Sequence, residues 1–207
     1  MEIIDISWPI TQSITEYKNK KYINIVQASD FKHDKVREKL ITIHSHTGTH
    51  IDAPSHFLHH GKSLDQLDLS KFYGPCKVFD LSDIKEKITD KDLEKFNINE
   101  NDIILLKTKN SVLHENINFT ENFVYLDKSG AQYLANKKIK TFGFDYLGIE
   151  RNQPEHNTHL FLLEAEIPII EGLRLKDVIE DEYILCCFPI LIKEADGAPA
   201  RAILIVK

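Results

Sequence analysis

Short and almost uninterrupted apolar runs recur along the chain, and they constrain its fold more than any other feature. The clearest are DIILLKT at 102–108 and YILCCFPILI at 183–192. Runs of this length without polar alternation are typical of strands that are covered on both faces. Further strands are expected at 2–7, 22–26, 39–45, 76–81, 122–126, 139–145, 167–170 and 201–207.

Three segments between these runs have the signals of helices. TDKDLEKF at 89–96 begins with a threonine that an aspartate follows three residues later, which resembles a capping box. SGAQYLANKK at 129–138 begins at a serine and ends in lysines, as the helix dipole favours. The third is NTHLFLLEAE at 157–166. Because strands alternate with only a few helices, the sequence predicts an α/β fold, a strand-rich single domain over 1–207.

Charge and composition exclude several classes of protein. The formal net charge of −6 and the lack of a long basic run argue against nucleic acid as a partner. No apolar stretch approaches the roughly 20 residues of a membrane helix, and the N-terminus lacks the features of a secretory signal. The three cysteines form no CxxC motif, so they are expected as reduced thiols of a cytoplasmic protein.

Six of the ten histidines lie in one segment, IHSHTGTHIDAPSHFLHHG at 43–61. Within it, His46, His50, Asp52 and His56 form the pattern His-x3-His-x-Asp-x3-His. Imidazole and carboxylate are ligands that zinc, iron and manganese prefer. The glycine between the first two histidines permits a tight turn, and Asp52 projects to the same side as His50 on an extended segment. The pattern therefore predicts a metal site.

The other histidines of this segment, His44, His59 and His60, are expected at the surface or behind the ligands. An anion-binding turn at 59–63 is a weaker alternative use of that stretch. His33 and His114 lie in polar stretches and are also expected at the surface.

A three-ligand segment usually needs completion from elsewhere in the chain. Glu171 ends a buried apolar run, and α/β folds commonly place site residues at strand ends. A surface acid at a turn is the alternative for Glu171, whereas Glu164 and Glu166 are expected on a helix surface. His156 and His159, at the start of the third helical segment, are the nearest histidines.

The same histidine segment resembles a known family. HTGTHIDAPSHF resembles the HxGTHxDxPxH signature of the cyclase family of metal-dependent hydrolases, which includes bacterial kynurenine formamidases. Further blocks follow in the family's order over nearly the whole chain. They are IIDISWPI at 3–10, HHGKSLDQL at 59–67, GFDYLGIE at 143–150, THLFLLEAEIPIIEGL at 158–173 and ADGAPARAIL at 195–204.

The resemblance implies a role for each candidate residue. The implied metal ligands are His46, His50, Asp52, His159 and Glu171. Asp52 would be able to bridge two ions, and His159 with Glu171 would complete a second position. His56 would be the catalytic histidine rather than a primary ligand. The implied centre holds one or two divalent ions, zinc as in the formamidases or manganese as in isatin hydrolases, with no organic cofactor.

The resemblance also implies a swivelling β/β/α domain, a homo-oligomer (dimer or tetramer) and a small-molecule substrate. The implied reaction is hydrolysis of an aryl formamide such as N-formyl-kynurenine to kynurenine and formate. Alternatives are a cyclic amide of the isatin type, a lactone, or ring closure as the family name suggests. A metal-binding module without catalysis is the alternative of another class. Carboxylates with an extra histidine suit an open hydrolytic centre better than a closed structural one.

Two segments depart from the family pattern. TQSITEYKNKKY at 11–22 has neither the proline nor the glycine of the W-P-G-D/x-P element that lines the aryl pocket in formamidases. YLGIERNQPEH at 146–156 replaces a loop that often contains serine. The resemblance therefore implies the chemistry more closely than the identity of the substrate.

Overall fold

The computed structural model describes all 207 residues. Its strands are β1 Ile3–Asp5, β2 Asn24–Ser29, β3 Glu38–Thr42, β4 His50–Asp52, β5 Tyr73–Asp80, β6 Lys87–Ile88, β7 Ile103–Lys107, β8 Tyr125–Leu126, β9 Thr141–Phe144, β10 Ile169–Glu171, β11 Asp181–Pro189 and β12 Gly197–Val206. Its α-helices are α1 Phe31–Asp34, α2 Asp90–Leu93, α3 Lys128–Asn136 and α4 Asn157–Glu164.

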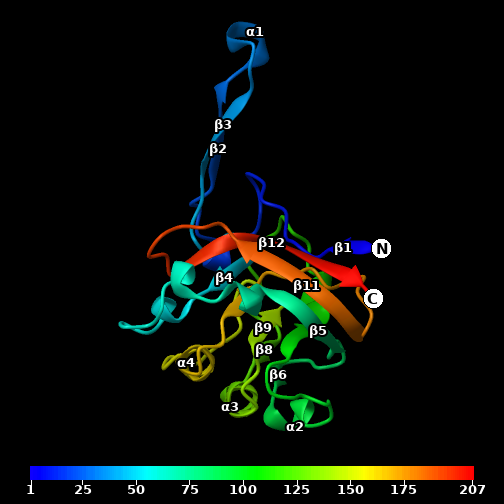
Figure 1. The fold of residues 1–207 in the computed structure, drawn as a ribbon. Helices are drawn as coiled ribbons and strands as arrows, with labels where there is room; N and C mark the ends of the chain where they lie inside the picture. Colours follow the sequence, from blue (N-terminus) through cyan, green and yellow to red (C-terminus); the bar gives the residue numbers. More distant parts are fainter.

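The main sheet closes on itself. Its strands follow the order β1-β12-β11-β5-β7-β9-β10-β4, and β4 pairs in addition with β12, so that all strands except β1 form a barrel-like ring. β5, β7, β9 and β10 run parallel, whereas β11, β12 and β4 join antiparallel. Helices α2, α3 and α4 lie together below the ring in Figure 1, and both termini lie near each other at its right-hand end. The predicted strand-rich α/β class is confirmed.

The two faces of β7 pack into two different cores. Ile103 and Leu105 belong to a cluster inside the ring, and Ile104 and Leu106 belong to a larger cluster that includes residues of α3 and α4. Since successive side chains of a strand point to opposite faces, a strand between two cores must be apolar at every position. This explains why DIILLKT carries no alternation.

The run YILCCFPILI does not fit the expectation of a strand covered on both faces. Burial alternates along β11, which ends at Pro189, and Leu191 beyond it is 81% exposed. Only one face of β11 packs on the core: Tyr183, Leu185 and Cys187 are buried, whereas Phe188 is 43% exposed. Cys76 and Cys187 are buried and free, and burial raises the pKa of the Cys76 thiol to about 12.

Every expected strand and helix segment contains an element of the expected type, and three short elements were not expected. These are β4, β6 and α1. The capping box at the start of α2 is present: Thr89 and Asp92 bond each other's backbone amides. No helix combines the length and apolarity needed to cross a membrane.

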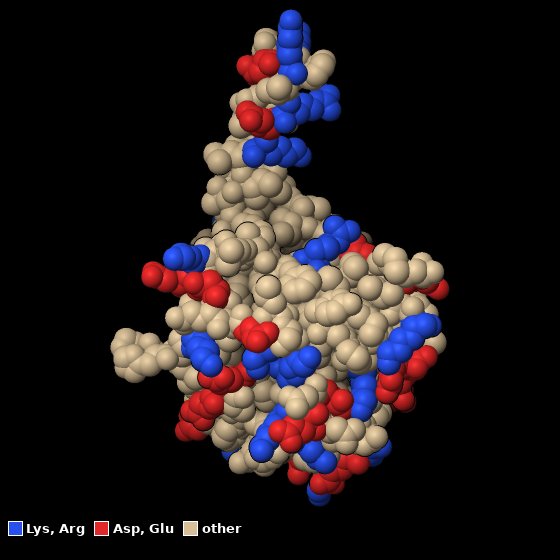
Figure 2. All heavy atoms as spheres, viewed as in Figure 1, with Lys and Arg blue, Asp and Glu red and all other residues tan.

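Strands β2 and β3 form a separate hairpin that projects from the body and carries α1 at its tip, and we refer to residues 22–42 as the arm (Figure 1). Figure 2 shows charged side chains at its far end and uncharged ones nearer the body. Its exposed large apolar side chains are Tyr22, Val26, Phe31, Val36, Leu40 and Ile41. A two-stranded hairpin alone is marginally stable in water.

Candidate metal centre

The short strand β4 fixes the centre of the site. His50 and Asp52 are two residues apart on it, so both side chains point to the same face, while Ile51 points into the barrel core. Glu171 of β10 pairs directly with His50 across the antiparallel ladder. Directly opposed side chains lie on one face of a sheet. Two strands thus bring two carboxylates and an imidazole together.

Hydrogen bonding leaves one nitrogen of His50 free to face these carboxylates. Its Nδ1 donates to the carbonyl oxygen of Gly48 at 2.9 Å. Its Nε2 lies 3.4 Å from Oδ1 of Asp52 and 3.3 Å from Oε2 of Glu171. A backbone carbonyl that fixes the tautomer in this way is typical of histidines that bind metal.

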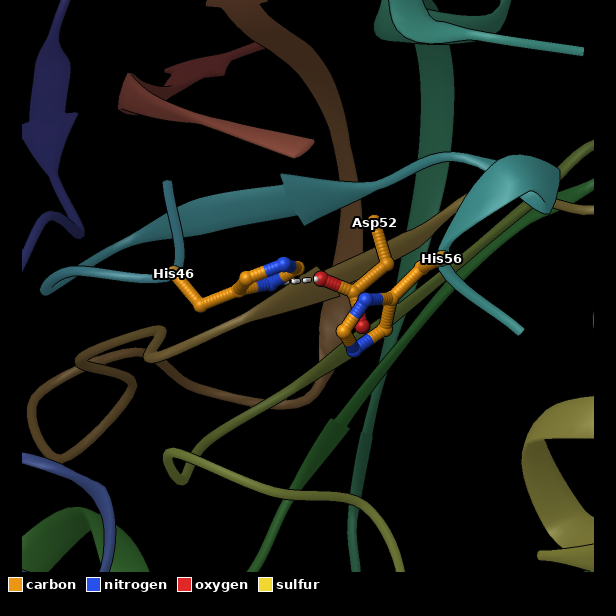
Figure 3. Close-up of side chains that lie close together, drawn as sticks. All are labelled: His46, Asp52 and His56. Carbon is orange, nitrogen blue, oxygen red and sulfur yellow. Dashed lines mark hydrogen bonds and ion pairs between the residues drawn. The ribbon is translucent and has the colours of Figure 1, made fainter. Parts of the chain in front are cut away.

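His46 approaches Asp52 from the loop before β4. Its Nδ1 lies 2.8 Å from Oδ1 of Asp52, and its Nε2 lies 2.9 Å from Oδ2 of Asp196. Figure 3 shows His46 and Asp52 joined by this contact, with the His56 ring beside them. Asp196 lies in the loop before β12 and comes to the site because β12 pairs with β4. One carboxylate oxygen of Asp52 therefore faces both His46 and His50.

His56 lies at the end of the 3₁₀ helix Pro54–His56 and is partly exposed. Its ring centroid is 4.0 Å from that of His46, and its Nδ1 is 3.3 Å from Oδ2 of Asp196. It is the only one of the six candidates whose side chain is more than a quarter exposed, at 28%. His56 is thus positioned at the edge of the cluster rather than at its centre.

His159 reaches the site from the first turn of α4. Its Nε2 lies 3.6 Å from Oε1 of Glu171 and 3.9 Å from Oδ2 of Asp52. Its Nδ1 lies 3.1 Å from Oε2 of Glu150, an ion-pair contact whose angles do not suit a hydrogen bond. The ring therefore lies between a site carboxylate and a supporting carboxylate. His156, the other histidine of this helix start, is exposed and contacts Glu150.

The electrostatics of the cluster favour positive charge. Burial lowers the pKa of His46, but Asp52 and Asp196 outweigh it and raise that pKa to about 9. Burial also lowers the pKa of His159, but the carboxylates of Glu150 and Glu171 outweigh this effect and raise that pKa to about 10. His56 behaves differently, because burial lowers its pKa.

The donor set fits a divalent cation. Asp52 and Glu171 are 1% and 4% exposed, and buried carboxylates are retained in proteins when they are paired or coordinate metal. Asp52 belongs to two groups whose candidate ligand atoms lie within 4.8 Å of one another, one with His46 and His56 and one with His50 and Glu171. Asp52 is the one candidate residue that the two groups have in common.

All six candidate residues line one cavity of about 280 Å³. They are His46, His50, Asp52, His56, His159 and Glu171. His59 and His60 are exposed and do not line it, whereas exposed His44 lies at its rim and stacks on Tyr22.

Sequence reasoning missed Glu150 and Asp196 as parts of the site. Both lie in blocks that matched the family, GFDYLGIE and ADGAPARAIL, but no ligand spacing connects them with the histidines. Asp145, in the first of these blocks, is buried and accepts hydrogen bonds from Thr108 and Ser111, so it ties the end of β9 to the segment that follows β7.

The Cyclase family model, described as "Putative cyclase", matches residues 4–151. The chain belongs to the Cyclase family. It is 32% identical over 206 residues to a kynurenine formamidase of Bacillus cereus, with 98% of this chain and 97% of that protein covered. The kynurenine formamidase of Bacillus anthracis is also 32% identical, with 97% and 96% covered.

Solved structures of the family share the fold. A potential metal-dependent hydrolase with cyclase activity superposes with a TM-score of 0.89 at 40% identity, covering 98% of this chain and 96% of that one. Isatin hydrolase A of Labrenzia aggregata gives a TM-score of 0.85 at 21% identity, covering 100% and 94%, a likeness of fold alone. The architecture expected from the resemblance is confirmed.

A methyl group at Gly197 should disturb the site although Gly197 is not itself a candidate ligand. A Cβ there would lie 2.7 Å from the backbone oxygen of Ile51 and 2.9 Å from Cε1 of His46. Both distances are far inside van der Waals contact, so Gly197→Ala should displace His46 and lower the metal-to-protein ratio by about half or more. Elemental analysis after dialysis, with circular dichroism as the control for folding, measures it. An unchanged ratio would show that the His46 position tolerates movement.

Proposed function

We propose that this chain is a metal-dependent hydrolase that cleaves the C–N bond of an aryl formamide, converting a substrate such as N-formyl-kynurenine and water into kynurenine and formate. The observation that carries the proposal is the cavity in which four imidazoles and two buried carboxylates lie together, with Asp52 common to both groups of candidate ligands. Curated relatives that align along nearly their whole length are named kynurenine formamidases.

We assign the ion-holding role to five residues: His46, His50, Asp52, His159 and Glu171. A bound divalent ion would polarise a carbonyl oxygen and lower the pKa of water. Zinc is the ion that we propose, with manganese as the alternative, because imidazole and carboxylate donors suit both.

His56 is the proton carrier in this proposal. Burial lowers its pKa, so it is neutral near pH 7 and able to accept a proton from the attacking water. The same proton then passes to the amide nitrogen as the C–N bond breaks, so that formate and an aryl amine leave. Asp196, at 3.3 Å from Nδ1 of His56, orients the ring for this transfer.

Other activities have less support. Isatin hydrolases share the fold at 21% identity, which says nothing of the substrate here. A closed structural metal site would not need a partly exposed histidine such as His56 at its edge. The chain has no G-x-S-x-G elbow for a serine nucleophile.

We propose in addition that residues 1–207 act as one hydrolase domain, in the cytoplasm, and as a homo-oligomer. The arm supports the oligomer. Its apolar side chains include Leu40 at 60% and Ile41 at 54% exposure, so much of their surface is open to solvent. The arm itself is nearly neutral, with four lysines and arginines against three acids, so its exposed apolar surface rather than its charge supports a contact with a second copy.

Purified protein should contain zinc or manganese and hydrolyse formanilide and N-formyl-kynurenine. A chelator should abolish turnover, and adding back the metal should restore it. Elemental analysis and release of formate measure both effects. Turnover of isatin without turnover of either formamide would overturn the substrate class. Metal content with no turnover of any amide would favour a non-catalytic module.

His56→Ala should retain metal and lose about a hundredfold or more in kcat, the usual contribution of a general base. His50→Ala, Asp52→Ala, His159→Ala and Glu171→Ala should each lower the metal-to-protein ratio instead. Elemental analysis beside steady-state kinetics separates the two classes. A metal-free His56→Ala protein would make His56 a ligand and remove it as the proton carrier.

The double variant Leu40→Asp/Ile41→Asp should reduce the mass in solution toward that of one chain, because a charge at both apolar positions opposes their burial in an interface. Light scattering after size exclusion measures the mass. Leu191→Asp, at an exposed apolar position outside the arm, is the matched control. Dissociation by the control alone would move the interface to the end of β11.

A further inference from the structure

We propose that Lys18 and Lys20 form an anion-binding subsite at the mouth of the metal cavity, and that the preferred aryl formamides carry a carboxylate. This inference rests on the proposed function and narrows its substrate class. It concerns the segment in which the chain departs from the family pattern, TQSITEYKNKKY at 11–22.

The two lysines line the same cavity as the candidate metal ligands. Both belong to its wall, together with His46 and Glu171. Neither ammonium has a carboxylate within 4.0 Å. Their nearest recorded partners are rings: Nζ of Lys18 lies 5.2 Å from the centroid of Tyr17, and Nζ of Lys20 lies 5.8 Å from that of Tyr22. Both charges are therefore available to a ligand.

The backbone that carries these lysines is held in an uncommon conformation. Lys18 and Asn19 have φ values of 52° and 57°, in the left-handed region that side chains other than glycine seldom adopt. Oδ1 of Asn19 accepts from the amide of Phe119 at 2.7 Å, and Thr15 donates to the carbonyl of Ile117 at 2.7 Å. The loop is thus tied to a distant segment at two points and presents Lys18 in a fixed direction.

Aromatic side chains line the cavity near the lysines and near a candidate ligand. Tyr17 and Tyr22 lie within 5.2 and 5.8 Å of the Lys18 and Lys20 ammonium groups, and Phe57 stacks on His159 at 4.4 Å between ring centroids. An aryl ring between these walls would have its formamide near Asp52 and its far substituent near the ammonium groups. Two other carboxylates line the cavity, and both have partners: Glu16 accepts from the amide of Tyr22, and Glu150 contacts His156 and His159. A bound cation would offset Asp52 and Glu171, which leaves the two ammonium groups as the unpaired charges of the cavity wall.

The charge of the substituent can be varied while the reaction stays the same. We compare 4-formamidobenzoate, which carries a carboxylate on the side of the ring opposite the formamide, with formanilide, which is neutral. Lys18→Gln/Lys20→Gln should lower kcat/KM for 4-formamidobenzoate by about tenfold or more, mainly through KM, as loss of charged hydrogen bonds predicts. Formanilide should change by less than about twofold, since it has no group to lose contact with.

Lys21→Gln is the matched control, because Lys21 is in the same loop but lines a different cavity. It should leave both substrates unchanged. Equal losses on both substrates in the double variant would overturn the subsite and make the lysines structural. Losses on 4-formamidobenzoate from Lys21→Gln as large as those from the double variant would also overturn it, in favour of general steering by charge. If the unaltered metal-loaded protein turned over neither formamide, the proposed function would fail instead.

Discussion

The pairing of β4 with strands on both of its edges is the constraint on which the site depends. β10 and β12 hold its three residues in register, and this register sets His50 opposite Glu171 and Asp52 opposite Gly197. A shift by one residue would turn both side chains into the barrel core and bring Ile51 to the cavity. The candidate metal centre therefore depends on the register of the sheet as well as on the spacing of residues in the motif.

Buried charge is the second constraint. Asp52 and Glu171 lie side by side away from water, and like charges so placed destabilise a fold unless something compensates them. Here imidazoles lie against the two carboxylates, whose negative charge raises the pKa of His46 and His159 and so favours their positively charged forms. The same field attracts a divalent cation, whose binding would displace those protons. One arrangement thus accounts for folding with buried carboxylates and for affinity toward metal.

The sequence predicted the strands and helices well because apolar periodicity and caps are local signals. It also predicted the six candidate residues, whose meeting at one cavity the structure describes. It could not predict β4, since a strand of three polar and apolar residues has no periodicity. Glu150 and Asp196 escaped for a different reason. Both join the site through the tertiary arrangement of distant segments, which residue spacing does not encode. The exposure of the outer face of β11 also depends on tertiary arrangement, so the sequence did not predict it.

The closed ring has a consequence for the dynamics of the site. A strand at a sheet edge can open by breaking one ladder, but β4 has partners on both sides and no free edge. Its opening must break both ladders together, which places its free energy of opening near that of global unfolding. Amide hydrogens of β4 should then exchange with solvent among the slowest in the chain. The arm, joined to the body only at its base, lies at the opposite end of that range.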